Sequence, residues 1–185
     1  MDLAPSRPSW HALAVKSRQE KAAASDLCTR GFEVFLPTTA ERRIWSDRIQ
    51  KVELALFPGY LFVHAALSAK SRVEMLKARG AVDLVGKLAG DTRIARAIPE
   101  WQIESLRAVV ASERALDPVS RLVPGTVVEV GAGPLKGARG IVEQGTDGKR
   151  RLVVQVALLG RGVRCVLSAD DVVEAVVEGP IRTVA

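Results

Sequence analysis

The chain has 185 residues, 48% of them hydrophobic and 26% charged, which predicts one large or two small folded domains and argues against a disordered chain. No uninterrupted apolar stretch approaches the roughly 20 residues of a membrane span, so we expect a cytoplasmic protein without membrane association. The 27 Lys and Arg exceed the 21 Asp and Glu, and the net charge of +6 suits a nucleic-acid partner without requiring one.

The first half predicts a small α+β sandwich, because strand and helix patterns follow one another along it. Alternating apolar residues indicate the first strand, and Gly31 ends the first helix. Ser68 caps the second helix, where Val73 and Leu76 are expected to face inward, and Pro99 suits the first turn of the third. Residues 38–52 carry charges without a helical period, which indicates an exposed hairpin or long loop. The predicted strands span residues 10–16, 32–36, 53–64 and 81–85, and the helices span 18–30, 68–79 and 99–110.

The second half predicts a small β-barrel, because its apolar residues recur with a period of two. Five short β-rich runs lie about ten residues apart, at 126–130, 141–144, 151–158, 163–167 and 172–177. All eight aromatic residues lie in the first 101 positions, which indicates a boundary between two domains. The predicted domains are 1–112 and 124–178, with a linker at 113–123 that contains Pro118 and a tail at 179–185.

No set of residues predicts catalysis, a bound metal or another cofactor. His11 and His64 each lie in a strand pattern without a second ligand at metal-binding spacing. Cys28 and Cys165 lack the neighbours of an activated thiol, and we expect both to be small core residues. The glycine-rich run 131–140 lacks the ending of a phosphate-binding loop, and a strand follows it, so it predicts a strand-to-strand turn in which glycines adopt positive φ.

The strongest local signal is the apolar run at residues 56–63. In a strand, Leu61 and Val63 would share one face while Tyr60 and Phe62 share the other. One face can belong to the core. The face with two large aromatic side chains would either be buried under a helix or form an exposed surface for a partner.

Two parts of the chain resemble one protein family, in that family's order. Residues 10–21, 35–37 and 56–63 resemble the N-terminal (NGN) domain of NusG-type transcription factors, and residues 130–142 resemble the KOW motif that follows it. The resemblance implies an α+β fold, in which an NGN domain with an antiparallel sheet flanked by helices is joined to an SH3-like KOW β-barrel. It also implies a monomeric, non-enzymatic elongation and antitermination factor.

The resemblance implies three interaction sites. Tyr60 and Phe62 match positions that bind the clamp helices of bacterial RNA polymerase and so favour processive elongation, and Phe57 and Pro58 would shape the strand's approach to them. In RfaH-like paralogues a neighbouring basic face touches the non-template DNA strand, and the positions that match it here are Lys16, Thr29, Arg30 and Arg79. The KOW domain would bind the ribosome or the termination factor Rho weakly, through Leu158, Leu159 and Arg161.

The segment 42–48 resembles specialised paralogues, of the RfaH-like or polysaccharide-operon type, more than the housekeeping factor. The Val- and Gly-rich second half favours a permanent barrel over one that refolds into helices.

The alternative function is a KOW-containing ribosomal or general RNA-binding protein. That alternative predicts a basic barrel. Residues 113–185 carry 10 basic and 9 acidic side chains, whereas residues 1–112 carry 17 basic and 12 acidic side chains, so the basic excess lies in the first half.

Overall fold

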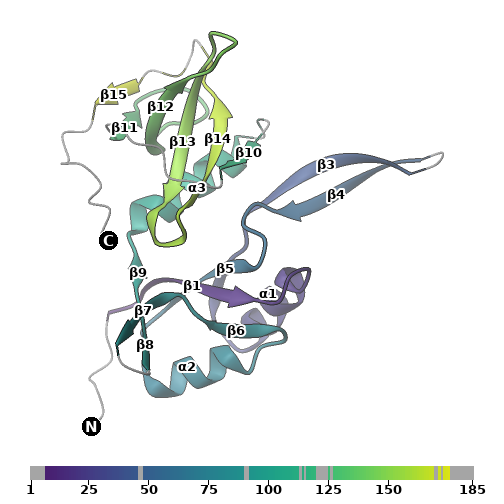
Figure 1. Cartoon of the computed structure of the whole chain (residues 1–185), viewed down its shortest axis with the longest axis vertical. Helices are drawn as coiled ribbons and strands as arrows, with labels where there is room; N and C mark the ends of the chain where they lie inside the picture. Colours follow the sequence, from purple (N-terminus) through teal and green to yellow (C-terminus); the bar gives the residue numbers. More distant parts are fainter. Residues whose placement is uncertain are drawn as a thin grey trace. The chain divides into compact units, whose positions relative to one another are not determined.

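The computed structural model describes residues 7–45, 48–89, 92–112, 114, 116–119, 125, 127–168, 171 and 173–175. The chain divides into two compact units, Met1–Pro99 and Glu100–Ala185, which are described separately below (Figure 1). Part of the segment 42–48 and all of the predicted tail, residues 179–185, lie outside the described residues. None of the helices in the described part has the length and apolar character needed to cross a membrane.

The first unit is built on an antiparallel sheet with β1 at its centre. The strands follow the order β2-β5-β1-β6, and β9 also pairs with β1. Their bounds are Ser9–Val15 (β1), Glu33–Phe35 (β2), Tyr60–Ala65 (β5), Ala81–Leu84 (β6) and Ala97–Ile98 (β9). The strands predicted at 10–16, 32–36 and 81–85 are therefore confirmed. The run predicted at 53–64 instead spans the end of β4 (Arg48–Ala55), a turn and most of β5, and β9 was not predicted.

Two helices, α1 (Glu20–Thr29) and α2 (Ala69–Leu76), supply residues to the core on one face of this sheet. Leu61 and Val63 belong to that core, as predicted from their alternation. The predicted cap of α2 is confirmed, because Ser68 and Ser71 each bond the other's backbone N–H through a side-chain oxygen. Val73 was wrongly expected to face inward: it is 52% exposed, and the fully buried side chain of α2 is Met75.

Two hairpins complete the first unit. β3 (Thr38–Trp45) and β4 (Arg48–Ala55) pair along their whole length and form a long arm that extends from the sheet of this unit (Figure 1). This confirms the hairpin alternative for residues 38–52. A shorter hairpin, β7 (Gly86–Ala89) with β8 (Thr92–Ala95), was not predicted.

The second unit contains a six-stranded antiparallel sheet in the order β10-β14-β13-β12-β11-β15. Its core is formed largely by Val and Leu side chains, which explains how the unit folds with few aromatic residues. Strands were predicted at the positions of β11 to β15. The bounds of the six strands are Leu116–Val119 (β10), Val127–Val130 (β11), Arg139–Gln144 (β12), Arg150–Val156 (β13), Arg161–Val166 (β14) and Val173–Ala175 (β15).

The second unit begins earlier than the predicted domain at residue 124. Helix α3 (Glu100–Ala111) was predicted correctly as a helix, but it packs against β12 and β13 and is grouped with the second unit. The Arg139 N–H donates to the Ser105 hydroxyl at 2.8 Å. In addition, β10 lies inside the predicted linker and pairs with β14, which places Pro118 beside Val163. Since β10 is the first strand of the sheet order, its position is one that tolerates proline.

Candidate functional site

The turn at Phe57–Tyr60 connects β4 to β5. The Tyr60 N–H donates to the Phe57 carbonyl at 3.0 Å, which closes a four-residue turn. Pro58 occupies the second position and Gly59, with φ of +82°, occupies the third. Proline followed by a residue with positive φ is the signature of a type II turn, so the residues in the middle of the turn determine its conformation.

The structure brings the four predicted polymerase-binding residues together but exposes only two of them. Phe62 is fully buried, with its ring centroid 5.6 Å from that of Phe57 and 6.1 Å from that of Phe35. Phe57 is only 1% exposed. Tyr60 is half-buried and Pro58 is exposed. The expected face therefore divides into a buried aromatic layer, Phe57 and Phe62, and a surface formed by Pro58 and Tyr60.

Gly59, at the third position of this turn, forms hydrogen bonds with the end of β1 and the start of α1. The Val15 N–H donates to the Gly59 carbonyl, and the Gly59 N–H donates to Oε1 of Glu20, both at 2.8 Å. Glu20 is only 7% exposed although it lies in the first turn of α1. We did not predict a role for Glu20, because no local pattern marks an acidic residue at the start of a helix as buried.

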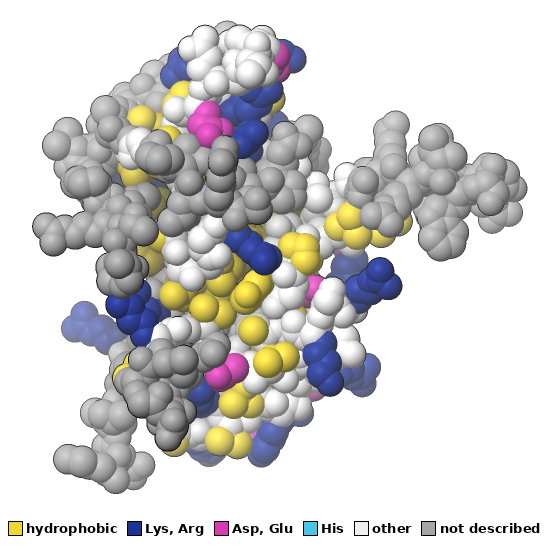
Figure 2. All heavy atoms as spheres, viewed as in Figure 1, with side chains coloured by type: hydrophobic (Ala, Val, Ile, Leu, Met, Phe, Trp, Pro, Cys, Tyr) yellow, Lys and Arg dark blue, Asp and Glu magenta, His cyan; other side chains and the backbone are white. Residues whose placement is uncertain are grey.

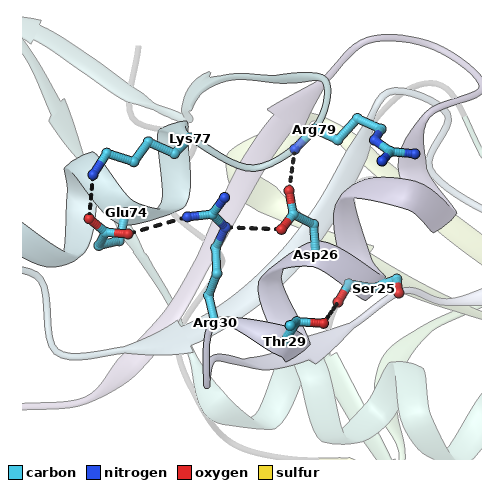
Figure 3. A network of polar contacts seen from close by, with 7 residues as sticks. All are labelled: Ser25, Asp26, Thr29, Arg30, Glu74, Lys77 and Arg79. Carbon is cyan, nitrogen blue, oxygen red and sulfur yellow. Dashed lines mark hydrogen bonds and ion pairs between the residues drawn. The ribbon is translucent and has the colours of Figure 1, made fainter.

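The predicted nucleic-acid-binding residues lie in and beside a polar network that joins the ends of α1 and α2 (Figure 3). Arg30 donates to Asp26 at 3.0 Å and to Glu74 at 3.3 Å, so its charge is balanced by two carboxylates. Lys77 donates to Glu74 at 2.6 Å. The Thr29 hydroxyl donates to the Ser25 carbonyl, one turn earlier in α1.

The backbones of Lys16 and Arg79 lie close together beside this network. The Lys16 N–H donates to the Gly80 carbonyl, so the end of β1 lies next to the residue that follows Arg79. The Arg79 N–H donates to Asp26, while its guanidinium points away from that carboxylate (Figure 3). The structure thus brings the four predicted residues together, and all four are exposed. They differ in their bonds, because Arg30 is held by two carboxylates and the Thr29 hydroxyl bonds the helix backbone.

The network keeps its two carboxylates ionised. Hydrogen bonds from the Arg79 N–H and the Arg30 side chain lower the pKa of Asp26, and a hydrogen bond from Lys77 lowers the pKa of Glu74. Two cations, Arg30 and Lys77, therefore bond the two carboxylates, while Arg79 contributes its backbone N–H. Lys and Arg side chains are also more frequent than Asp and Glu on the face of the molecule shown in Figure 2, where they are spread out rather than gathered in one patch.

The predicted partner site of the second unit lies on the connection between β13 and β14. Leu158 and Leu159 belong to a short 3₁₀ helix, Ala157–Leu159, and Gly160 follows with φ of +61°. Arg161 begins β14 and pairs with Val156. Leu158, Leu159 and Arg161 are half-buried, so the structure brings them together with part of each accessible.

The glycine-rich run 131–140 has the predicted form of a turn between strands. Gly133 and Gly137 have φ of +88° and +82°, and the Gly137 N–H donates to the Val130 carbonyl at 2.7 Å. Leu135 and Ala138, both within the run, are fully buried. The run therefore closes the core of the second unit.

The histidines and cysteines are placed apart. His11 is buried and bonds Ser9 and the Arg96 carbonyl, and its burial lowers its pKa. His64 pairs with Glu33 and stacks on Trp10. Cys165 is buried as predicted, whereas the prediction for Cys28 was wrong because that residue is exposed. Within the described residues, no three His, Cys, Asp or Glu side chains are grouped to hold a metal ion.

The chain is similar in sequence to proteins of one family. The family model described as "NusG: Transcription termination factor nusG" matches residues 8–107. The chain is 27% identical over 149 residues to "Transcription termination/antitermination protein NusG" of Halalkalibacterium halodurans, which covers 80% of this chain and 83% of that protein. It is 26% identical over 145 residues to the protein of the same name from Escherichia coli K12, which covers 77% and 78%. Among solved structures, "Domain interaction in Thermotoga maritima NusG" matches with a TM-score of 0.49 at 16% identity, which covers 87% of this chain and 93% of that chain.

Proposed function

Because the chain belongs to the NusG family of transcription factors, we propose that it is a non-enzymatic elongation and antitermination factor that binds the clamp helices of RNA polymerase. The observation that carries this proposal is the family match over residues 8–107, which contains the whole sheet of the first unit and the turn at Phe57–Tyr60. Two relatives with the printed name "Transcription termination/antitermination protein NusG" support the same role. Binding at the clamp would favour processive elongation.

The turn would contact polymerase through Pro58 and Tyr60, with Phe57 and Phe62 as the layer that supports them. A half-buried tyrosine next to an exposed proline can bury further apolar area on a partner without a change in the chain's own core. Truncation of such an anchor costs on the order of 2 kcal/mol of binding free energy. The buried rings of Phe57 and Phe62 would set the height and direction of the turn.

The test is a binding titration of the full chain with core RNA polymerase, using Tyr60→Ala as the variant. Phe62→Ala is unsuitable, because removing a fully buried ring costs about 3–5 kcal/mol of folding stability and confuses binding with folding. Val166→Ala is the control, since Val166 is 39% exposed on β14 of the second unit, outside the sheet that carries the turn. We expect Tyr60→Ala to weaken binding about thirtyfold and Val166→Ala to leave it unchanged. No binding by the folded wild-type chain would refute the function, whereas tight binding by Tyr60→Ala would refute only the site.

We also propose that the basic face contacts the non-template DNA strand, with Lys16 and Arg79 as the main phosphate ligands. All four residues of the face are exposed, but Arg30 is balanced by Asp26 and Glu74, and the Thr29 hydroxyl bonds the helix backbone. Arg30 and Thr29 would therefore contribute less than their positions alone indicate. Attraction to phosphate releases counterions, so the affinity would fall with salt.

This contact can be tested with a labelled single-stranded DNA and the full chain at several salt concentrations. We expect Lys16→Ala to weaken binding and to reduce the salt dependence by roughly one counterion. Lys136→Ala removes the same charge from an exposed position in the second unit and serves as the control. Equal effects of the two substitutions would mean that only the net charge matters and that the face is not a site.

For the second unit we propose a weak contact with the ribosome or Rho through Leu158, Leu159 and Arg161. The three side chains share one connection and are partly accessible, which suits a small apolar contact beside a cation. Leu159→Ala should weaken the binding of the full chain to purified ribosomes or Rho in a titration. Unchanged binding to both would contradict the proposed site.

A further inference from the structure

We propose that Glu20 is a positioning residue for polymerase binding, because its carboxylate fixes the turn that carries Pro58 and Tyr60. This inference rests on the function proposed above. The Gly59 N–H, in the middle of the turn, donates to Oε1 of Glu20 at 2.8 Å, and Glu20 is only 7% exposed. Glu20 itself is too buried to contact a large partner, so it would act through the backbone of the turn.

Both polar groups of Gly59 are bonded to the same short connection. The Gly59 carbonyl accepts from Val15, the last residue of β1, and the Gly59 N–H donates to Glu20, the first residue of α1. The turn is therefore held on two sides by residues that the sheet and helix α1 already fix. Loss of the Glu20 bond would leave the Val15 bond and the buried rings of Phe57 and Phe62 in place, so the change would be confined to the backbone around Gly59.

The conformational freedom of glycine gives this bond a role. Its φ of +82° lies in the region that glycine adopts readily, but glycine also samples many other conformations at little cost. A hydrogen bond from its N–H to a buried carboxylate selects one of them. Preorganisation of this kind improves affinity because the turn need not be ordered when the partner binds.

The same connection also carries part of the basic face. Lys16 follows Val15 directly, and its N–H donates to the Gly80 carbonyl, next to Arg79. Residues 15–20 thus hold the turn at Gly59 and the loop at Gly80 at the same time. This placement would keep the two proposed contact surfaces of the first unit in a fixed relation to each other.

Three substitutions separate the hydrogen bond from the charge. Glu20→Gln keeps a side-chain oxygen at the same reach but removes the charge. Glu20→Asp keeps the charge and suits the first turn of a helix, but its carboxylate is one methylene short of the Gly59 N–H. Glu20→Ala removes both features. Glu53→Ala is the control, because it removes an exposed carboxylate from β4 that pairs with Lys21.

Two measurements on the full chain test the proposal. The first is the hydrogen-exchange rate of the Gly59 amide by NMR, and the second is the affinity for core RNA polymerase. We expect Glu20→Asp and Glu20→Ala to expose the Gly59 amide and to weaken binding about tenfold, the effect of losing one such hydrogen bond. Glu20→Gln and Glu53→Ala should retain both properties within about threefold.

The pattern across the variants decides the outcome. If Glu20→Asp behaves as wild type while Glu20→Gln is impaired, the charge rather than the acceptor matters, and the proposal is wrong. An unchanged Gly59 amide in the folded Glu20→Asp protein would also overturn it, as would exposure of that amide without loss of affinity. If wild type fails to bind polymerase while Gly59 responds as expected, the proposed function fails but the control of the turn by Glu20 stands.

Discussion

Arg114 and Asp171 form a two-pronged ion pair in the second unit, with the Asp171 side chain fully buried. The same guanidinium donates to the Ser168 hydroxyl and the Val166 carbonyl. Arg114 lies between α3 and β10, whereas its partners lie at and after the end of β14. The pair therefore fastens the segment predicted to be a linker to the sheet.

Removal of Arg114 should destabilise the second unit strongly. Arg114→Ala leaves a buried carboxylate without its cation, and breaking such a pair costs about 3 kcal/mol or more. Hydrogen exchange of the β13 and β14 amides in the full chain measures this loss. Asp147→Ala is the control, because Asp147 pairs with Arg151 at a partly exposed site and its loss should cost about 1 kcal/mol or less. Equal losses in the two variants would contradict the importance of the Arg114 pair.

The same pair predicts how stability depends on pH. Burial alone would raise the pKa of Asp171, but hydrogen bonds from Arg114 and Ser168 outweigh it and hold the pKa below the ordinary value of 3.8. A carboxyl group with a lowered folded-state pKa stabilises the fold above that ordinary value and loses this contribution as the pH falls through the folded-state pKa. The free energy of unfolding of wild type should thus exceed that of Asp171→Asn at pH 7, and this difference should shrink below about pH 4. If urea unfolding gives the same difference at pH 7 and at about pH 3, the lowered pKa of Asp171 does not stabilise the fold.

Removal of Asp26 should strengthen DNA binding. This carboxylate balances Arg30 and accepts the Arg79 N–H, so Asp26→Ala leaves more positive charge on the proposed DNA-binding face. We expect about threefold tighter binding of single-stranded DNA at roughly 50 mM salt and a smaller gain at roughly 200 mM. Asp83→Ala, which removes the partner of Arg72, is the control for a change in net charge alone. Weaker binding by Asp26→Ala would mean that Asp26 orients the cations for DNA.

The two cysteines should differ sharply in reactivity. Cys28 is exposed on α1, whereas Cys165 is buried in β14 and its burial raises its pKa to about 11. At pH 8 only about one Cys165 thiol in a thousand would be ionised, so a thiol reagent should label Cys28 quickly and Cys165 only after unfolding. Cys28→Ser should abolish the fast phase. Rapid labelling of two thiols per folded chain would contradict the placement of Cys165.

The sequence predicted those elements whose local pattern and final environment agree. The strands of the second sheet carry alternating apolar residues that the core needs, and Ser68 stands where a capping residue is required. β10 could not be predicted, because it is short and contains Pro118, and its strand geometry comes from pairing with β14. Tertiary contacts override local preference in such a segment.

The sequence predicted which candidate residues share a strand face, but not how exposed each of them is. Alternation correctly separated Leu61 and Val63 from Tyr60 and Phe62, yet it could not show that Phe62 is buried against Phe35 and Phe57. The hydrogen bond of Glu20 to Gly59 joins residues 39 positions apart, and no local pattern contains such a contact. Cys28 was misplaced because α1 has a weakly apolar face, on which Leu27 and Ala23 are buried while Cys28 is not.

The packing of α3 has a practical consequence for chimeric proteins made from members of this family. The family match extends into α3, to residue 107, but the helix bonds β12 through Ser105 and belongs to the compact unit of the second sheet. A chimera that takes residues 113–185 from this chain and the preceding part from a relative would therefore pack this sheet against the relative's helix. It would lose the hydrogen bond from the Arg139 N–H to the Ser105 hydroxyl. A junction at Pro99 would transfer α3 together with the sheet that it covers.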